Sequence, residues 1–179
     1  AGKGEKLRYN WNTPIHQSPN HPGTIYIGAQ FLFRSADQGQ SWQRISPDLT
    51  TNDPDRQKQE LSGGITVDNS SAEMHTTIYS ISESPLDDKL IWVGTDGGGL
   101  GRWQAGRWTR YTTRQGLISN SSGYLLEDGQ GYLWIGSNAG LQRVLKQALN
   151  DLAADFAAAL KQKEHGSGSQ YLSEYESRP

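Results

Sequence analysis

The sequence predicts an all-β fold made of repeated strand units and followed by one helix. Three segments share a design in which a turn leads into an apolar strand that ends in glycine, and a second strand follows after a short turn. The strand-ending glycines are Gly28, Gly94 and Gly136. The interval from the second to the third suits one four-stranded β-propeller blade, which takes about 40–50 residues. The first interval is longer and indicates an insertion.

The composition agrees with many short antiparallel strands joined by turns. The chain has 21 Gly, 6 Trp and 8 Tyr among its 179 residues. Alternating polar and apolar residues predict strands over 75–82 and 107–111. The continuous apolar runs 90–93 and 133–135 predict strands that are buried on both faces between neighbouring blades.

We therefore expect propeller blades over 1–144, as about three four-stranded units. The units are 9–46, 75–112 and 117–144. The polar stretch 47–70 has no strand period and predicts a long surface loop inserted between blades.

The C-terminal part of the sequence changes character. Leucine and phenylalanine recur at helical spacing and predict an amphipathic helix over 145–164. The remainder, 165–179, opens with a Gly/Ser tract that is typical of a flexible tail.

Composition also limits the function classes. The formal net charge of -2 lacks the basic excess of a nucleic-acid-binding protein. No apolar run approaches the roughly 20 residues of a membrane helix, and the first residues lack the apolar stretch of a signal peptide. With no cysteine and with scattered histidines, we expect no metal site and no cofactor. The histidines are His16, His21, His75 and His165.

One turn carries a known pattern. The sequence SADQGQSW over 35–42 resembles the Asp-box, with serine where the box has threonine. Its pattern positions are Ser35, Asp37, Gly39, Ser41 and Trp42. We expect the aspartate to accept backbone N–H bonds, the glycine to adopt a positive φ and the tryptophan to pack into the blade. The expected role of the box is structural.

The N-terminal half, about 7–97, resembles bacterial sortilin-like and sialidase-repeat propeller proteins. The resemblance rests on LRYNWNTPI, TIYIGAQFLFRSADQGQSW, ISPDLTTNDP and AEMHTTIYSISESPLDDKLIWVGTDGG. The C-terminal half, about 92–151, resembles the repeats of two-component regulator propellers. That resemblance rests on YTTRQGLISN and EDGQGYLWIGSNAGL. The two overlap at 92–98, and we hypothesise that the chain is a chimera, natural or designed.

Several positions recur as structural residues of the predicted blades. Besides the three strand-ending glycines they are Trp92, Asp128, Gly131 and Trp134. Asp128 lies in an Asp-Gly turn, where its expected role is to form the turn.

The sialidase-like resemblance makes a glycoside hydrolase the enzyme hypothesis to weigh. That chemistry needs two carboxylates, or a tyrosine nucleophile with a carboxylate partner, around a sugar pocket. Nothing in the sequence pairs two of the acidic residues near strand ends, and we expect no catalytic residue. Those acidic residues are Glu73, Glu83, Asp96, Glu127 and Asp128. Candidate binding residues are Glu73, His75, Asp96 and Arg102.

Closure of the fold raises a separate question, because three blades do not make a ring and propellers typically have four to eight. Two three-blade chains closing one ring by twofold symmetry would satisfy both open edges. Alternatively, the chain is a piece of a larger propeller, or the helix covers the open face.

The function we expect is a non-catalytic binding or scaffold module that self-assembles. Its partner would be another copy of itself or a protein or peptide, without nucleic acid or membrane insertion. The alternatives are a glycosidase and an engineered or recombined propeller without an evolved function. The resembled families imply a periplasmic or secreted location.

Overall fold

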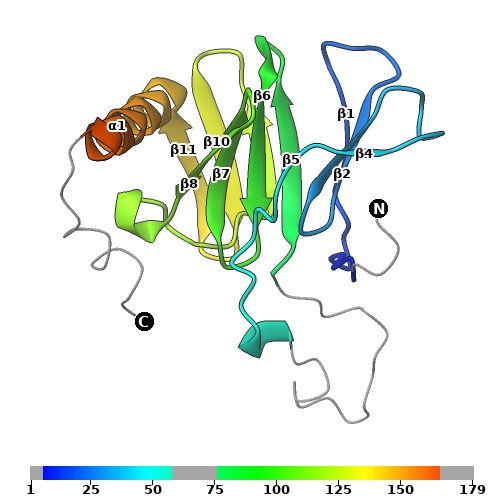
Figure 1. The fold of residues 1–179 in the computed structure, drawn as a ribbon, viewed down its shortest axis with the longest axis horizontal. Helices are drawn as coiled ribbons and strands as arrows, with labels where there is room; N and C mark the ends of the chain where they lie inside the picture. The colour runs from blue at the N-terminus through cyan, green and yellow to red at the C-terminus, as the bar shows by residue number, and fades with distance from the viewer. Residues whose placement is uncertain (1–5, 58–75, 166–179) are drawn as a thin grey trace. The chain divides into compact units, whose positions relative to one another are not determined.

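The computed structural model describes residues 6–57 and 76–165, and for 159–165 it describes the backbone alone. Three antiparallel sheets precede one helix along the chain (Figure 1). The chain divides into two compact units between Val144 and Leu145. The prediction of all-β propeller blades with a C-terminal helix is confirmed.

Blade 1 is a four-stranded sheet in which each strand pairs with the next one along the chain. Its strands are β1 (Ile15–Gln17), β2 (Ile25–Gly28), β3 (Leu32–Ser35) and β4 (Gln43–Arg44).

Blade 2 repeats this order with longer strands. They are β5 (Ile78–Ser84), β6 (Asp87–Thr95), β7 (Gly99–Gln104) and β8 (Arg107–Tyr111). Between blades 1 and 2 the described part of the chain forms the 3-10 turn η1 (Asp55–Gln57), and after blade 2 it forms η3 (Thr113–Gln115).

Blade 3 has three strands in the described structure, so the expectation of a fourth strand here is wrong. They are β9 (Tyr124–Glu127), β10 (Tyr132–Ser137) and β11 (Gly140–Leu145). The reason is that β11 runs directly into α1 (Lys146–His165), whose Ala- and Leu-rich sequence favours helix over strand. None of the described helices is long and apolar enough to cross a membrane.

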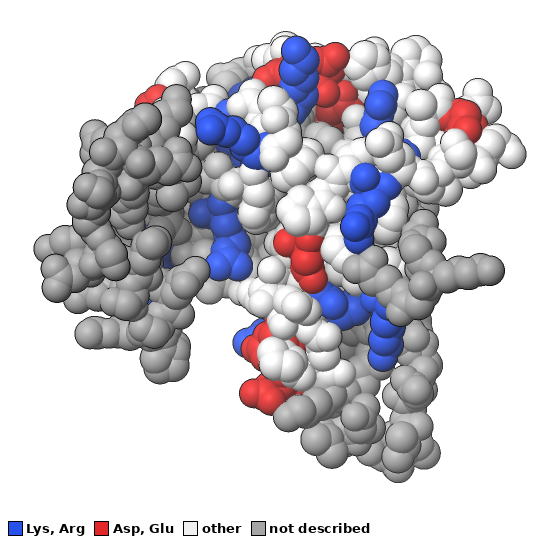
Figure 2. Space-filling view, in the orientation of Figure 1, with Lys and Arg blue, Asp and Glu red and all other residues white. Residues whose placement is uncertain are grey.

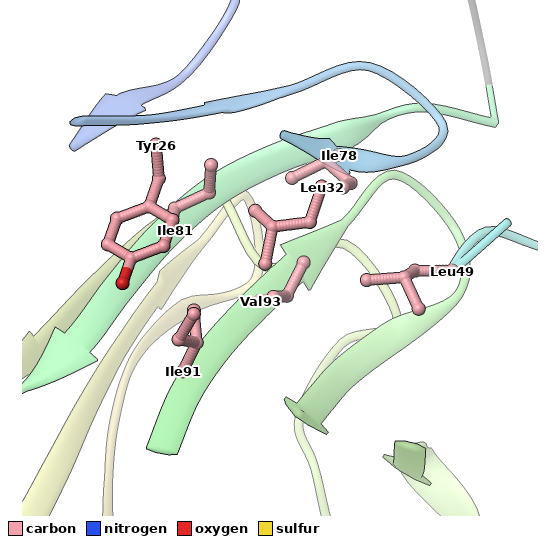
Figure 3. Close-up of a cluster of buried hydrophobic side chains, with 7 residues drawn as sticks. All are labelled: Tyr26, Leu32, Leu49, Ile78, Ile81, Ile91 and Val93. Atoms are coloured by element: carbon pink, nitrogen blue, oxygen red, sulfur yellow. The ribbon is translucent and has the colours of Figure 1, made fainter. Parts of the chain in front are cut away.

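Seam 1, between blades 1 and 2, contains the main hydrophobic cluster. Side chains from β2 and β3 meet side chains from β5 and β6 (Figure 3). The cluster consists of Tyr26, Leu32, Leu49, Ile78, Ile81, Ile91 and Val93. Leu49 corrects one expectation: the stretch 47–70 is not wholly a surface loop, because this leucine is fully buried and its N–H donates to the Gln30 carbonyl at 2.9 Å.

A glycine in each of the first two blades lies against the chain at the start of the next blade. A Cβ on Gly28 would lie 2.6 Å from Ile78 Cγ2, and one on Gly94 would lie 2.0 Å from the Ser122 carbonyl oxygen. Larger residues would therefore push the blades apart. Backbone bonds hold both contacts, from Ile78 N–H to Ala29 O at 2.7 Å and from Ser122 N–H to Thr95 O at 3.2 Å.

The apolar runs behave differently in blades 2 and 3. All of 90–93 is buried, which confirms the expectation for β6. In β10, Leu133 and Ile135 are buried but Trp134 is partly exposed, so burial on both faces is wrong there. Trp92 faces blade 3, whereas no further described sheet packs against the Trp134 face of blade 3.

Candidate functional site

Two of the acidic residues singled out in the sequence occupy the same position in successive blades. Glu83 pairs with Ile91, and Glu127 pairs with Leu133, in each case the residue that precedes the tryptophan of the second strand. Both glutamates are buried. They therefore lie within the blade interfaces and are not open to solvent.

Glu83 is held in seam 1 by donors from blade 1. Asn20 Nδ2 donates to Glu83 Oε1 at 2.7 Å and to the Ser84 carbonyl at 2.8 Å. The backbone N–H of Glu83 donates to His16 Nε2 at 3.1 Å, so this ring nitrogen is an acceptor. Burial lowers the pKa of His16, with the negative charge of Glu83 acting in the opposite direction.

Tyr26 of blade 1 lies near Glu83 in seam 1. Burial, and then the nearby Glu83 carboxylate, raise the pKa of Tyr26 to about 12. The phenol therefore stays protonated across the physiological range, and its hydroxyl can donate to the carboxylate. Since Tyr26 and Arg34 are cross-strand partners, an aromatic residue and an arginine of blade 1 face the glutamate of blade 2.

Seam 2, between blades 2 and 3, repeats the arrangement with other donors. Ser84 Oγ donates to Glu127 Oε1 at 2.9 Å, and Trp92 Nε1 donates to Glu127 Oε2 at 3.3 Å. Trp92 and Arg102 are cross-strand partners, as Tyr26 and Arg34 are in blade 1. Each glutamate is thus engaged across its own seam.

The four candidate binding residues are not gathered into one described site. Asp96 lies in the β6–β7 turn, where Ser121 Oγ donates to its Oδ1 at 3.1 Å. Arg102 instead donates to Gln104, whose amide reaches Asp87 at the start of β6. Asp96 and the Arg102 contacts therefore lie at opposite ends of blade 2. Glu73 and His75 fall outside the described residues.

The turn over 35–42 is organised around the Asp37 carboxylate. Ser41 donates its hydroxyl to Oδ2 at 2.6 Å and its N–H to Oδ1 at 2.9 Å, and Ser35 Oγ donates at 2.7 Å. These bonds lower the pKa of Asp37 to about 2. Gly39 has φ of 92°, in the left-handed region. Trp42 does not pack into the blade as expected: it is 41% exposed and its ring lies beside Gly39 of the same turn, just before the two-residue edge strand β4.

Asp128 organises the turn between β9 and β10. It accepts N–H bonds from Gln130 at 2.8 Å and Tyr132 at 3.1 Å, and Trp134 Nε1 donates to its Oδ2 at 3.0 Å. Desolvation acts against it, but the bond from Trp134 and the backbone bonds lower the pKa of Asp128. Gly131, in the same turn, has φ of 94°.

A further cluster, centred on Arg8, escapes the sequence argument. Its guanidinium forms an ion pair with Asp48 at 2.6 Å, and its Nε donates to the Thr76 carbonyl at 3.3 Å. Its backbone N–H donates to Gln30 Oε1 at 2.7 Å. Arg8 thus joins the N-terminal segment to blade 1 and to the start of blade 2. No local pattern signals this, because its side-chain partners Asp48, Thr50 and Thr76 lie 40, 42 and 68 residues away.

Charge on the visible face is mixed. Among the described residues of this face, Figure 2 shows basic and acidic side chains interspersed among uncharged ones, without a field of one sign. Within the described ranges, no three His, Cys, Asp or Glu side chains come together as a metal-binding group.

Comparison with known proteins shows which fold the chain resembles. A family model described as two component regulator propeller matches residues 116–139, which include β9 and β10. The extracellular domain of the hybrid two-component system BT3049 from B. thetaiotaomicron superposes with a TM-score of 0.51 and 21% identity, over 82% of this chain and 18% of that chain. The chain has a two-component regulator propeller-like fold.

Two other solved structures were found with lower TM-scores. The extracellular domain of the hybrid two-component system BT4673 from B. thetaiotaomicron gives 0.47 with 14% identity, over 79% of this chain and 16% of that chain. PorZ, a surface component of the type-IX secretion system of Porphyromonas gingivalis, gives 0.45 with 18% identity, over 81% and 18%. This chain therefore spans under a fifth of the length of each. No curated protein matches the sequence.

Proposed function

We propose that this chain is a non-catalytic β-propeller module that binds a protein or peptide. The observation that supports the non-catalytic part of this proposal is that Glu83 and Glu127 are held within the blade interfaces. Both are buried and accept hydrogen bonds from the preceding blade, Glu83 from Asn20 and Glu127 from Ser84 and Trp92. A general acid or nucleophile must reach its substrate, and these carboxylates serve blade packing instead.

Recognition would use the loop end of the blades, which carries the β2–β3 and β6–β7 turns and the connections between blades. Loops on a rigid sheet scaffold commonly carry binding residues. Asp96 and Ser121 are hydrogen-bonded to each other at this end and are partly exposed. We place the module outside the cytoplasm, since the BT3049 domain with the similar fold is extracellular.

The glycosidase alternative is tested with a panel of chromogenic glycosides. The proposal expects no turnover by the native chain above that of a heat-denatured sample. Glu127→Gln and Glu73→Gln are the matched variants. Clear turnover that either substitution abolishes, with the fold retained by circular dichroism, would replace the binding proposal with an enzymatic one.

Self-association would complete the ring. In the described structure blades 1 and 3 each have one sheet face without a neighbouring blade, and a second chain related by a twofold axis would supply those neighbours. Sedimentation equilibrium tests this part: a reversible dimer supports it, and a single monomeric species at all concentrations contradicts it.

A further inference from the structure

The outer face of blade 3 exposes side chains at positions that are buried in the other blades. Leu141 follows Gly140 at the start of β11, as Leu100 follows Gly99 at the start of β7. Leu100 is fully buried, whereas Leu141 is 68% exposed. Tyr124 and Leu126, which pair with Gly136 and Trp134 and so share their face of the sheet, are also exposed. This face carries apolar side chains on all three strands, together with Arg143, whose guanidinium lies over the Trp134 ring at 5.5 Å.

The face of blade 1 that would meet a preceding blade is covered in part by the chain itself. It carries Ile27 and Phe33, and the N-terminal residues Leu7 and Tyr9 pack against the cluster around Phe33.

The inner strand β1 of that face is nevertheless exposed. Ile15 of blade 1 and Ile81 of blade 2 occupy equivalent positions on their inner strands. Each pairs with the residue just before the strand-ending glycine, which is Ile27 in blade 1 and Val93 in blade 2. Ile81 packs in seam 1 and is 8% exposed, but Ile15 is 71% exposed. Trp11, shortly before β1, is exposed as well. The exposed side chains of Trp11 and Ile15 thus lie just before and at the start of the inner strand that would meet a preceding blade.

Gly136 is the blade 3 equivalent of Gly28 and Gly94, but no strand of a following blade lies against it in the described structure. A Cβ on Gly28 or Gly94 would collide with the next blade, whereas the nearest atom to a Cβ on Gly136 is Tyr124 Cβ of the same blade at 3.1 Å. The position is equivalent, but no inner strand of the described chain covers it. Blade 3 therefore exposes the face that receives an inner strand in the internal seams, and blade 1 exposes an inner strand of the kind that packs there.

We propose that the inner strand of blade 1 in a second copy docks on the outer face of blade 3 and forms a third kind of seam, between chains. This inference rests on the proposed self-association and names its surface. A second copy fits because the same chain carries both halves of an interface that it forms twice internally. The chain continues from β11 into α1, so the next blade does not follow directly in sequence. A twofold axis would generate two identical inter-chain seams.

The internal seams indicate which side chains meet. In seam 1, Ile81 of blade 2 and Leu32 of blade 1 belong to one cluster. The matching positions in the inter-chain seam are Ile15 of one copy and Leu141 of the other. Gln17 is the blade 1 equivalent of Glu83, because it pairs with Ile25 in the way that Glu83 pairs with Ile91. In the inter-chain seam, Gln17 of the docking copy would therefore lie where the glutamates lie in seams 1 and 2.

A charge-complementation experiment tests the proposal on the full chain by sedimentation velocity. Ile15→Lys and Leu141→Glu each place an unpaired charge in both seams of a homodimer, and each should weaken self-association at least about tenfold. In an equimolar mixture the heterodimer has one native seam and one seam in which the two introduced charges meet. Mixing should therefore restore association beyond that of either variant alone.

The control is Leu86→Lys, at a side chain that is 71% exposed in the β5–β6 turn. This substitution should leave association unchanged. A native dimer that neither seam substitution weakens, or a mixture that associates no better than its components, overturns the docking surface while leaving self-association intact. A native chain that stays monomeric overturns both. Because the substituted side chains are exposed, circular dichroism should show all three variants folded.

Discussion

The indole N–H of Trp92 donates to Glu127 across seam 2 at 3.3 Å, and both residues are buried. Trp134, the equivalent residue of the next blade, donates instead to Asp128 within its own blade. The same tryptophan position therefore serves blade packing where a following blade exists and serves a local turn where none is described.

Removal of the Glu127 carboxylate should destabilise blade packing. Glu127→Ala leaves Trp92 Nε1 and Ser84 Oγ without their buried acceptor, so we expect the free energy of unfolding to fall by about 1–3 kcal/mol. Glu127→Gln keeps one acceptor oxygen and should cost less. Urea denaturation measures both. Asp88→Ala, which removes an exposed partner of His21, is the control and should cost about 0–1 kcal/mol; a loss of equal size at both sites would contradict the seam role.

The strand-ending glycines should differ in their tolerance of alanine. Gly94→Ala places a Cβ 2.0 Å from the Ser122 carbonyl oxygen, so we expect a loss of about 3 kcal/mol or more. Gly136→Ala meets only the exposed Tyr124 side chain of its own blade, with the nearest atom, Cβ, at 3.1 Å, and should cost about 1 kcal/mol or less. Denaturation at a protein concentration low enough to keep the chain monomeric separates the two. Similar losses would show that the two glycines do not differ in this way.

His16 should make seam 1 sensitive to acid. Its pKa is lowered by burial in the folded chain, so the unfolded chain, with a histidine pKa of about 6.5, binds the proton more readily. The contribution to stability is thus complete above pH of about 6.5 and is lost as the pH falls through the lower pKa of the folded state. His16→Asn removes the titration. The stability difference between native and variant chains, measured by urea denaturation, should shrink on acidification; a difference that is constant with pH would contradict this.

Asp37 should make the stability of the fold depend on pH in a lower range than His16 does. With its pKa lowered to about 2 by the bonds from Ser41 and Ser35, its contribution is present above the ordinary aspartate value of about 3.9 and is lost as the pH falls through about 2. Asp37→Asn should lower the melting temperature at neutral pH and flatten the acid limb of the stability curve. Thermal scans between pH 2 and 7 measure this, and an unchanged acid limb would exclude the carboxylate as its source.

The predictable features were those encoded locally. The run 90–93 predicts a buried strand because four adjacent apolar residues need cover on both faces, and the structure supplies it. The identical reasoning fails at Trp134, because burial there depends on a neighbour and not on the strand itself. Trp42 fails likewise: its pattern predicts a turn, but not which surface its ring will cover.

The seam contacts escape prediction because they are long-range. Glu127 reaches Trp92 and Ser84 from 35 and 43 residues away, and no periodicity relates them. The sequence places Glu83 and Glu127 near strand ends. The register of β5 on β6 and of β9 on β10 is needed to show that they are equivalent.

Disulfide cross-linking most directly tests the central claim, that the exposed inner strand of blade 1 and the outer face of blade 3 form one interface between two copies. Asn12 is the equivalent of Ser122, since each lies three residues before the same position of an inner strand, Ile15 in blade 1 and Leu125 in blade 3. In seam 2 the Ser122 N–H donates to the Thr95 carbonyl, and Ser137 is the equivalent of Thr95 in blade 3. The proposed seam therefore brings Asn12 of one copy next to Ser137 of the other. The chain has no cysteine, so Asn12→Cys and Ser137→Cys introduce single thiols. Mild oxidation of the mixed variants should give a covalent dimer of twice 19.8 kDa on non-reducing electrophoresis. A yield no higher than that of Asn12→Cys mixed with Leu86→Cys would contradict the claim.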